Sequence, residues 1–343
     1  MCATRQMLVL ARKVQVTSGQ HREWANNPAR LLTTVCMLGL LISGCGAKQI
    51  ADSPRTASAS TISSTTIDVP FYSQQNYQCG PATMAMAMVH AGVEIAPDQL
   101  ESALFTPGLK GSLQVEMLAT PRRFGLLAYQ LKPELDDLLQ EVAAGHPVIV
   151  LQNLGLTIAP RWHYALITGL RPDQDTIILH SGEIANYSMP MSTFERTWQR
   201  GGSWAMVVLA AGDLPATADE KSYLTAVSGI EAHGFLRAAL RSYQAAISRW
   251  PESLGAGMGS ANCLYALGEL EQAANTYLQL TKTHPDAACA FNNLAQTYLD
   301  QGRHSDALAM IRQAIAIDPH SPLYLLTLTE VEQAQTKKRY QHL

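Results

Sequence analysis

The last third of the chain repeats itself every 34 residues. Because proline and glycine interrupt helices while small residues let helices pack closely, this spacing predicts units of two short helices each. One such unit cannot bury its apolar face alone, so successive units must stack and share a core. Three columns keep the register, one of proline, one of glycine and one of alanine: Pro251, Pro285, Pro319, Gly234, Gly268, Gly302, Ala239, Ala273 and Ala307.

This pattern is identified as the tetratricopeptide repeat. The resemblance implies an all-α repeat domain over residues 220–343 that binds a protein partner, with residues 320 to about 338 as its capping helix. The third copy shows the pattern most clearly: Phe291, Leu294, Ala295, Tyr298, Gly302, Ala307, Ala314 and Pro319.

A second strong constraint is the segment VPFYSQQNYQCGPATMAMAM at residues 69–88. Its small and long apolar residues, running from Cys79 until Gly92 ends them, predict a buried helix of about three turns. Cys79 would then lie at the positive end of the helix dipole, where the reactive thiolate is favoured. Such a cysteine could also be a packing residue. The amides before it favour a nucleophile, because they could donate hydrogen bonds to an oxyanion: Gln74, Gln75, Asn76 and Gln78.

The segment around residues 67–212 predicts helices first and strands afterwards, which is an α+β arrangement with a mostly antiparallel sheet. The predicted helices are Pro97–Leu104, Ser112–Phe124 and one that begins at Pro133 and ends before Gly145. The predicted strands are Pro147–Gln152, Trp162–Thr168, Thr176–Leu179 and Ser203–Leu209.

His163, near the start of one of these strands, is the candidate general base for Cys79. The two residues are distant in sequence, but a strand end that faces the helix can bring imidazole and thiol together. The alternative is a half-buried histidine whose ring bonds a backbone carbonyl.

The Cys79 segment and the strand HYALITG resemble the papain-like cysteine peptidases that remove double-glycine leaders from bacteriocins. They are closer still to stand-alone bacterial lipoprotein relatives that carry helical repeats. The resemblance covers about residues 67–212 and implies a papain-like fold in which Cys79 attacks the substrate, His163 is the base and Gln74 helps to form the oxyanion hole. Gln75 is the rival for the last role. The family needs no cofactor, and the absence of a Cys-x-x-Cys pair argues against a zinc site of the usual spacing.

The third member of the site departs from the family pattern. Where the family has an aspartate, this chain has Ser181, preceded by His180. A hydroxyl can accept an imidazole N–H but brings no negative charge to stabilise an imidazolium. Two functions therefore stay open, a cysteine peptidase acting on peptide or protein substrates and a catalytically degenerate adaptor that binds peptides. Transfer of the acyl group to an amine uses the same residues.

The N-terminus resembles a bacterial lipoprotein signal peptide over residues 1–44. Basic residues precede an apolar run, Leu31–Ile42, that is too short to cross a bilayer comfortably, and Cys45 follows small residues. The resemblance implies lipidation of Cys45, a membrane contact through that anchor, and an outer-membrane location facing the periplasm. The alternative is an uncleaved anchor with an incidental cysteine. Residues 45–66, rich in Ser and Thr, are expected to form a flexible tether.

Charge limits the partners further. Without residues 1–44 the chain holds 20 Lys and Arg against 27 Asp and Glu, a net charge of −7. An acidic chain without basic clusters argues against a nucleic-acid partner. Residues 213–219 are expected to be the linker between the peptidase-like and repeat domains.

Overall fold

The structure, a computed structural model, describes residues 63–73, 79–106, 108 and 111–341, the side chains of the last four excepted. The chain divides into a unit of residues Met1–Arg55 and a unit of residues Thr56–Leu343, and all described residues belong to the second. Among the described helices, none is both long enough and apolar enough to cross a membrane.

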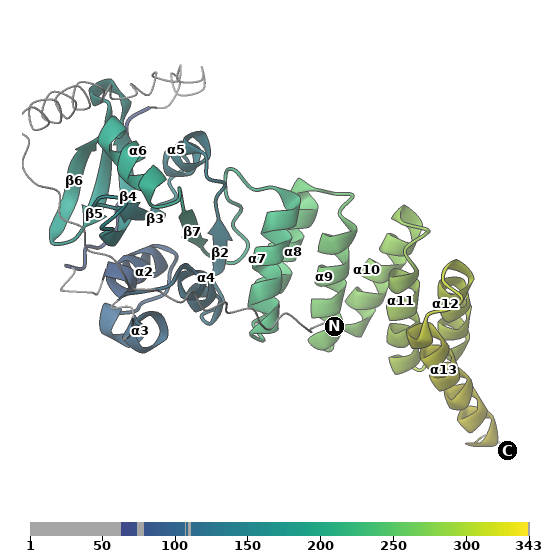
Figure 1. The fold of residues 1–343 in the computed structure, drawn as a ribbon. Coiled ribbons are helices and arrows are strands. Elements are labelled where there is room, and N and C mark those ends of the chain that lie inside the picture. Colours follow the sequence, from purple (N-terminus) through teal and green to yellow (C-terminus); the bar gives the residue numbers. More distant parts are fainter. Residues whose placement is uncertain (1–62, 74–78, 107, 109–110, 342–343) are drawn as a thin grey trace, which may run out of the picture. The chain divides into compact units, whose positions relative to one another are not determined.

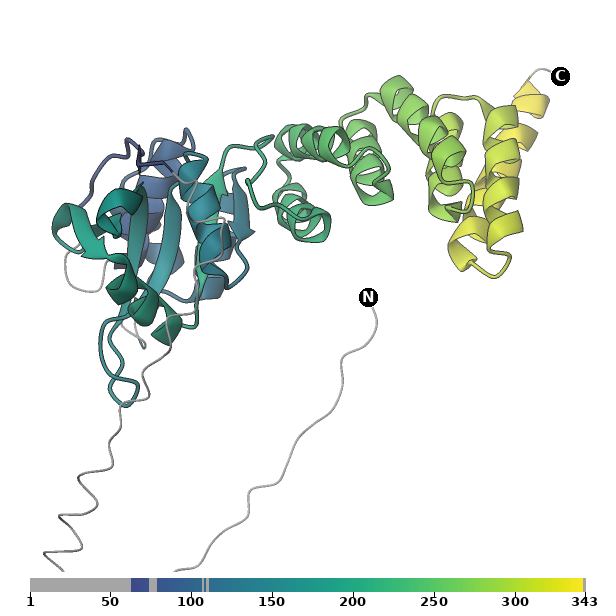
Figure 2. The ribbon, with the colours of Figure 1, turned by 90° about the horizontal axis from the view of Figure 1, so that it is seen from above.

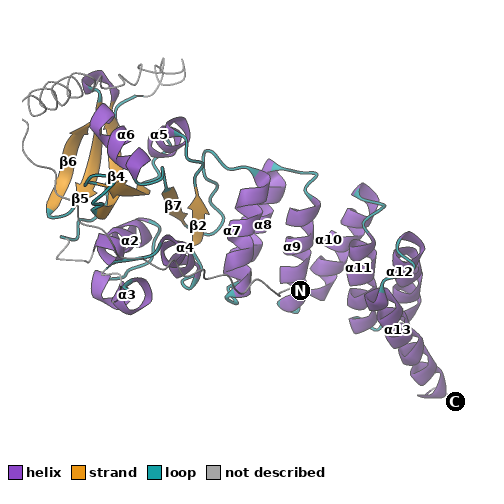
Figure 3. Cartoon of the chain, viewed as in Figure 1, coloured by secondary structure: helices purple, strands orange, loops and turns teal. Residues whose placement is uncertain are grey.

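The first half of this unit is a sheet with helices on both faces (Figures 1 and 3). The strand order is β2-β7-β3-β4-β5-β6, β1 also pairs with β4, and every pairing is antiparallel. The strands are β1 (Thr65–Thr66), β2 (Leu127–Gln130), β3 (Val148–Asn153), β4 (Trp162–Arg171), β5 (Thr176–Ser181), β6 (Ile184–Pro190) and β7 (Ala205–Leu209). The predicted α+β fold with a mostly antiparallel sheet is confirmed.

In Figure 1, helices lie both below the sheet and above it. The lower helices are α2 (Cys79–His90), α3 (Pro97–Leu104) and α4 (Gln114–Arg122), and the upper ones are α5 (Leu135–Ala143) and α6 (Met191–Arg200). A 3-10 turn, η3 (Pro172–Gln174), joins β4 to β5.

Helix α2 is the buried centre of this domain. Met84, Met86 and Met88 are fully buried, and the helix packs against α3 and strands β3, β4 and β7. Close packing begins at its first turn, because a Cβ atom on Gly80 would lie 2.1 Å from the Oγ atom of Ser112. The sequence therefore needs small residues at the start of α2 and adaptable methionines further along.

The second half of the unit is a stack of helices. They are α7 (Glu220–Ala232), α8 (Leu236–Arg249), α9 (Leu254–Ala266), α10 (Leu270–Thr283), α11 (Ala288–Asp300), α12 (His304–Ile317) and α13 (Pro322–Gln341). Gly234, Gly268 and Gly302 join the two helices of each pair with φ angles of 82°, 79° and 72°, which glycine adopts without steric cost. The alanine column is fully buried. The glycine and alanine columns of the 34-residue repeat thus have a structural cause, and α13 follows the third pair as the cap expected there.

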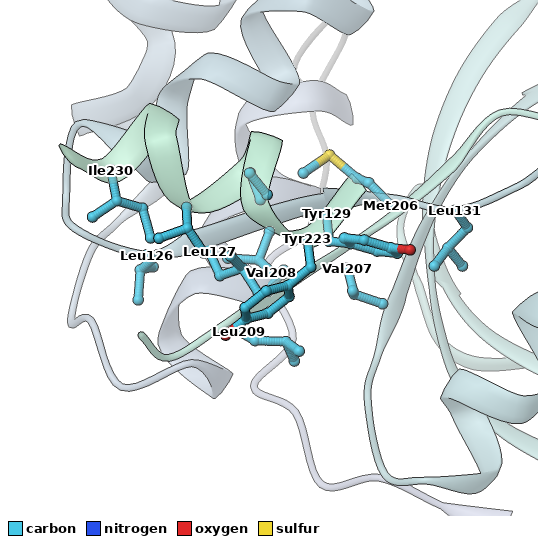
Figure 4. Packing of buried hydrophobic residues seen from close by; sticks show 14 of the residues in the cluster. Leu126, Leu127, Tyr129, Leu131, Met206, Val207, Val208, Leu209, Tyr223 and Ile230 are labelled. Atoms are coloured by element: carbon cyan, nitrogen blue, oxygen red, sulfur yellow. The ribbon is translucent and has the colours of Figure 1, made fainter. Parts of the chain in front are cut away.

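Helix α7 packs against the sheet as well as against α8. Figure 4 shows Tyr223 and Ile230 of α7 packed among apolar residues of the neighbouring strands β2 and β7, such as Leu127 and Leu209. Seen from above, α7 and α8 follow directly after the sheet (Figure 2). The first helix of the repeats thus also covers the edge of the sheet that β2 forms.

The connection between the two halves is held by a buried carboxylate. Glu141 of α5 is fully buried. Its Oε1 atom accepts hydrogen bonds from the backbone N–H (2.8 Å) and hydroxyl (2.6 Å) of Thr217. Its Oε2 atom lies 3.1 Å from the backbone N of Ala216 and 2.7 Å from Nδ1 of His146. Residues 213–219 are therefore fixed to the sheet domain at their centre.

Candidate active site

Cys79 is the first residue of α2, and its thiol is half-buried. Burial raises the pKa of this thiol, because a thiolate loses hydration there. Hydrogen bonds from the backbone of Tyr164, Gly80 and Cys79 itself lower the pKa, but by less than burial raises it. The sequence predicted that the helix N-terminus would favour the thiolate. In the structure the N–H groups at the start of α2 do lower the pKa of Cys79, but desolvation raises it by more.

His163 lies near the start of β4, opposite Gln152 of β3. Its Nε2 atom lies 2.9 Å from the Oγ atom of Ser181, at the end of β5. Burial, together with the positive charge of Arg161, lowers the pKa of His163 to about 4. The imidazole is therefore neutral at physiological pH, and one of its two nitrogens is engaged by Ser181.

Tyr164, the residue after His163, joins the two parts of the site. Its backbone hydrogen bonds to the Cys79 thiol, and its carbonyl oxygen lies 3.4 Å from the Thr83 hydroxyl, one turn further along α2. Its phenol donates a hydrogen bond of 3.2 Å to the carbonyl of Ser112, the residue that packs on Gly80. The first turn of α2 is thus attached to the start of β4, next to His163.

No sequence motif points to Tyr164 or Ser112 as parts of the site. Strand alternation around His163 predicts only that its neighbour points to the other side of the strand. Which helix that neighbour meets depends on how α2 packs on the sheet, and no local sequence signal specifies this.

His180, the other residue considered for orienting His163, has different partners. Its Nε2 atom lies 3.2 Å from the carbonyl oxygen of Val69, and its Nδ1 atom accepts a hydrogen bond of 3.2 Å from the backbone N–H of Asn186. Phe71 packs edge-on against the ring. Both nitrogens of this buried histidine are therefore occupied, Nε2 by the segment before α2 and Nδ1 by strand β6.

Three of the predicted positions lie outside the described residues. Gln74 and Gln75, the candidates for the oxyanion hole, precede Cys79 in residues 74–78, and Cys45 lies in residues 1–62. The described part of the chain contains no group of three or more His, Cys, Asp or Glu side chains that could hold a metal ion.

Two known families match parts of this chain. Residues 66–206 match the family described as "Peptidase_C39 like family", and this range contains Cys79, His163 and Ser181. Residues 231–280 and 260–322 match the tetratricopeptide repeat. The chain therefore has a peptidase C39-like domain followed by tetratricopeptide repeats.

Solved structures similar to parts of the chain include several repeat proteins. YrrB, described as a TPR protein with an unusual peptide-binding site, is 25% identical over 32% of this chain, with a TM-score of 0.30. This chain spans 57% of the length of YrrB. The Yersinia enterocolitica chaperone SycD, solved with a peptide of the translocator YopD, is 16% identical over 34% of this chain and 93% of its own, with a TM-score of 0.33. The Sgt2 TPR domain of Aspergillus fumigatus is 17% identical over 36% of this chain and 83% of its own, with a TM-score of 0.35. No curated protein matches the chain.

Proposed function

We propose that this protein is a lipid-anchored cysteine peptidase of the bacterial envelope whose repeats bind a protein partner. One observation carries the peptidase part of the proposal. The thiol of Cys79, at the start of α2, bonds the backbone of the residue after His163, and His163 in turn contacts Ser181. A nucleophile, a base and a group that orients the base are the parts that acyl transfer requires.

The hydrogen bond to Ser181 assigns the two imidazole nitrogens different roles. If the Nε2–H of neutral His163 donates to Ser181, the Nδ1 atom carries the free lone pair and is the base. Nδ1 takes the Cys79 proton as Sγ attacks the carbonyl carbon of a peptide. The carbonyl electron pair moves onto oxygen, where the backbone N–H of Cys79 and the side chain of Gln74 would stabilise the oxyanion.

The tetrahedral intermediate then collapses. Its C–N bond breaks, and His163 returns the proton to the leaving amine, so that an acyl-enzyme on Cys79 remains. Water attacks the thioester carbonyl while His163 accepts a proton from it. The C–S bond breaks next and His163 returns its proton to Sγ, which releases the carboxylic acid product and restores the thiol and the neutral imidazole.

A second function is favoured by the charges of the resting site. The pKa of Cys79 is raised, the pKa of His163 is lowered to about 4, and Ser181 carries no charge, so the ground state is a neutral pair. A site of this kind fits a degenerate peptidase domain that binds peptides without cutting them and recruits partners through the repeats.

The membrane part of the proposal rests on the sequence before the described residues. Cys45 would carry the lipid, and residues 45–66 would hold the peptidase domain away from the bilayer. The anchor would place the protein at the outer membrane, facing the periplasm. Metabolic labelling with palmitate tests this directly. The label should be incorporated by the wild-type chain and lost in Cys45→Ala, and label retained in that variant would refute the anchor.

The peptidase activity is tested by comparing envelope peptides from cells that carry the wild type, Cys79→Ala or His163→Ala. We expect cleavage products in the wild type only, since loss of a nucleophile or base lowers such rates by about 10² or more. Cys289→Ala, which removes an exposed free thiol of the repeats, is the matched control and should leave the products unchanged. Identical peptide profiles in the wild type and Cys79→Ala would reject the peptidase and leave the adaptor.

A further inference from the structure

The repeats contain a cavity of about 580 Å³ that lies among helices α9, α10, α11 and α13. This volume is in the range of sites that take small ligands or short peptide segments. Four of its lining residues carry side-chain amides, Asn262 on α9 and Asn292, Asn293 and Gln296 on α11. A side-chain amide both donates and accepts hydrogen bonds, as does the peptide backbone.

The three asparagine amides form a connected network. Nδ2 of Asn292 donates to Oδ1 of Asn293, and Nδ2 of Asn293 donates to Oδ1 of Asn262, both over 3.2 Å. The hydroxyl of Tyr277 donates to the same Asn262 oxygen. The network fixes the orientation of the amides before any ligand arrives, which lowers the entropy lost on binding.

One acceptor in the network is left over. Asn292 is only 5% exposed, and its Oδ1 atom has no hydrogen-bond partner among the described residues. A buried acceptor without a donor is unfavourable, so a ligand that supplies an N–H group gains affinity there. A backbone amide of an extended peptide is such a donor.

The charge of the cavity selects among peptides. Among the described residues that line the cavity, Glu330 of α13 is the one that carries a charge. Asp300 lies close by and accepts a hydrogen bond from the Tyr265 hydroxyl. That hydrogen bond, burial and the charges of Asp300 and Glu330 raise the pKa of Tyr265 to about 12. Two carboxylates without a lining cation repel an acidic side chain or a C-terminal carboxylate and attract a lysine or arginine.

Part of the cavity lining is apolar. Leu323 and Leu326 of α13 line the cavity, and each is 57% exposed. Two leucines exposed side by side on a cap helix offer a contact for an aliphatic side chain of the ligand.

We infer that this cavity binds an internal, extended peptide segment that pairs an aliphatic side chain with a basic one. The inference rests on the proposed role of the repeats in binding a partner, and it specifies the chemistry of that partner. The amides of α9 and α11 read the peptide backbone, Leu323 and Leu326 take the aliphatic side chain, and Glu330 with Asp300 takes the cation.

The test uses the detergent-solubilised full chain carrying Cys79→Ala, so that binding is measured independently of any peptidase activity. The probes are fluorescein-labelled seven-residue peptides, blocked at both ends, that contain leucine and differ only in a central lysine, glutamine or glutamate. Fluorescence anisotropy should show at least tenfold tighter binding of the lysine peptide than of the glutamate peptide. The glutamine peptide should lie between them.

Three variants locate the site. Glu330→Lys, an exposed position whose change does not threaten the fold, should reverse the order of the three peptides. Glu332→Lys makes the same charge change at an exposed position of α13 outside the cavity lining and should leave the order unchanged. Asn293→Leu should weaken the binding of all three peptides at least fivefold.

The inference is overturned if the three peptides bind equally, or if none binds. It is also overturned if Glu330→Lys and Glu332→Lys have the same effect on the order of the three peptides, or if a peptide with a free C-terminal carboxylate binds more tightly than the blocked peptide. A second copy of the chain that associates in sedimentation and competes with the peptides would overturn it as well. If the Cys79→Ala chain binds the lysine peptide while the wild type and Cys79→Ala give identical envelope peptide profiles, the peptidase is rejected and this inference is kept.

Discussion

The Nε2 atom of His163 lies 2.9 Å from the hydroxyl oxygen of Ser181. A neutral hydroxyl thus stands where a carboxylate would hold an imidazolium in place. The resting site therefore contains a neutral imidazole and a thiol, and any ion pair between Cys79 and His163 has to form during the reaction. The first two predictions follow from this difference in charge.

Alkylation of Cys79 by iodoacetamide should depend steeply on pH. Because burial raises the thiol pKa, the thiolate fraction should grow about tenfold per pH unit from about pH 6 to about pH 9. Peptide mass spectrometry of the folded chain measures the rate, with exposed Cys289 as an internal reference for reagent access. A rate that is already constant below pH 7 would show a preformed thiolate and contradict the structure.

Replacing Ser181 by aspartate should create the missing charge. A carboxylate beside Nε2 favours the imidazolium, so Ser181→Asp should raise the pKa of His163 from about 4 and stabilise a thiolate on Cys79. Alkylation of Cys79 at pH 6 should become about tenfold faster or more, since one pKa unit is a factor of ten. Ser181→Asn has nearly the same shape without the charge and should not accelerate it. Equal rates in the two variants would mean that charge at residue 181 does not reach the thiol.

Gly80→Ala should destabilise the domain at the first turn of α2. The new methyl group would lie 2.1 Å from Oγ and 2.6 Å from Cβ of Ser112, so backbone must move. Overpacking of this kind costs about 1–3 kcal/mol in the free energy of unfolding, which urea denaturation measures. Adding Ser112→Gly removes both atoms and should recover most of the loss. If the double variant were no more stable than Gly80→Ala, this contact would not be the cause.

Glu141→Gln should loosen the connection between the two halves of the unit. The carboxylate accepts four hydrogen bonds, and an amide cannot accept all of them, so we expect a loss of about 1–3 kcal/mol in unfolding free energy. The exposed Glu134→Gln at the start of α5 is the matched control and should have little effect.

The Glu141 carboxylate should also make the stability of the fold decrease as the pH falls. Desolvation raises the pKa of Glu141, but hydrogen bonds from His146, Thr217 and Ala216 lower it by more than desolvation raises it. The pKa of Glu141 is therefore below its ordinary value. A lowered folded-state pKa gives stability that is present above the unfolded value of about 4.3 and is lost as pH falls through the folded value. The wild type should therefore lose more stability than Glu141→Gln between about pH 5 and about pH 3. Parallel losses would show that Glu141 does not contribute.

The parts of the fold that local sequence determines were predictable. Helix α2 begins at Cys79 as expected, because Gly80 and Pro81 punctuate the chain there and the residues that follow favour a helix. The helix pairs of the repeats follow from glycines at fixed spacing. Strand β6 was not predicted, since five of its first six residues are exposed and carry no apolar alternation. Strand β2 is only four residues long and stands between two helices, and only its pairing with β7 defines it.

The candidate site was predictable in its chemistry but not in its energetics. Cys79 and His163 could be named from their sequence segments and Ser181 from the family resemblance alone, and the structure places His163 against Ser181. The direction of the Cys79 pKa could not be obtained in this way, because it depends on burial by segments distant in sequence. The contacts of Tyr164 likewise join residues that are 52 and 81 positions apart in the sequence. Those of Glu141 with Ala216 and Thr217 join residues 75 and 76 positions apart.

The buried Glu141 also determines where this protein can be divided. A cut at residues 213–219, the boundary that sequence alone suggests, would remove the hydrogen-bond partners of that carboxylate and strip Tyr223 and Ile230 from the sheet. Chimeras that exchange repeat arrays between such proteins should therefore be joined after α7, so that each peptidase-like domain keeps its own first repeat helix.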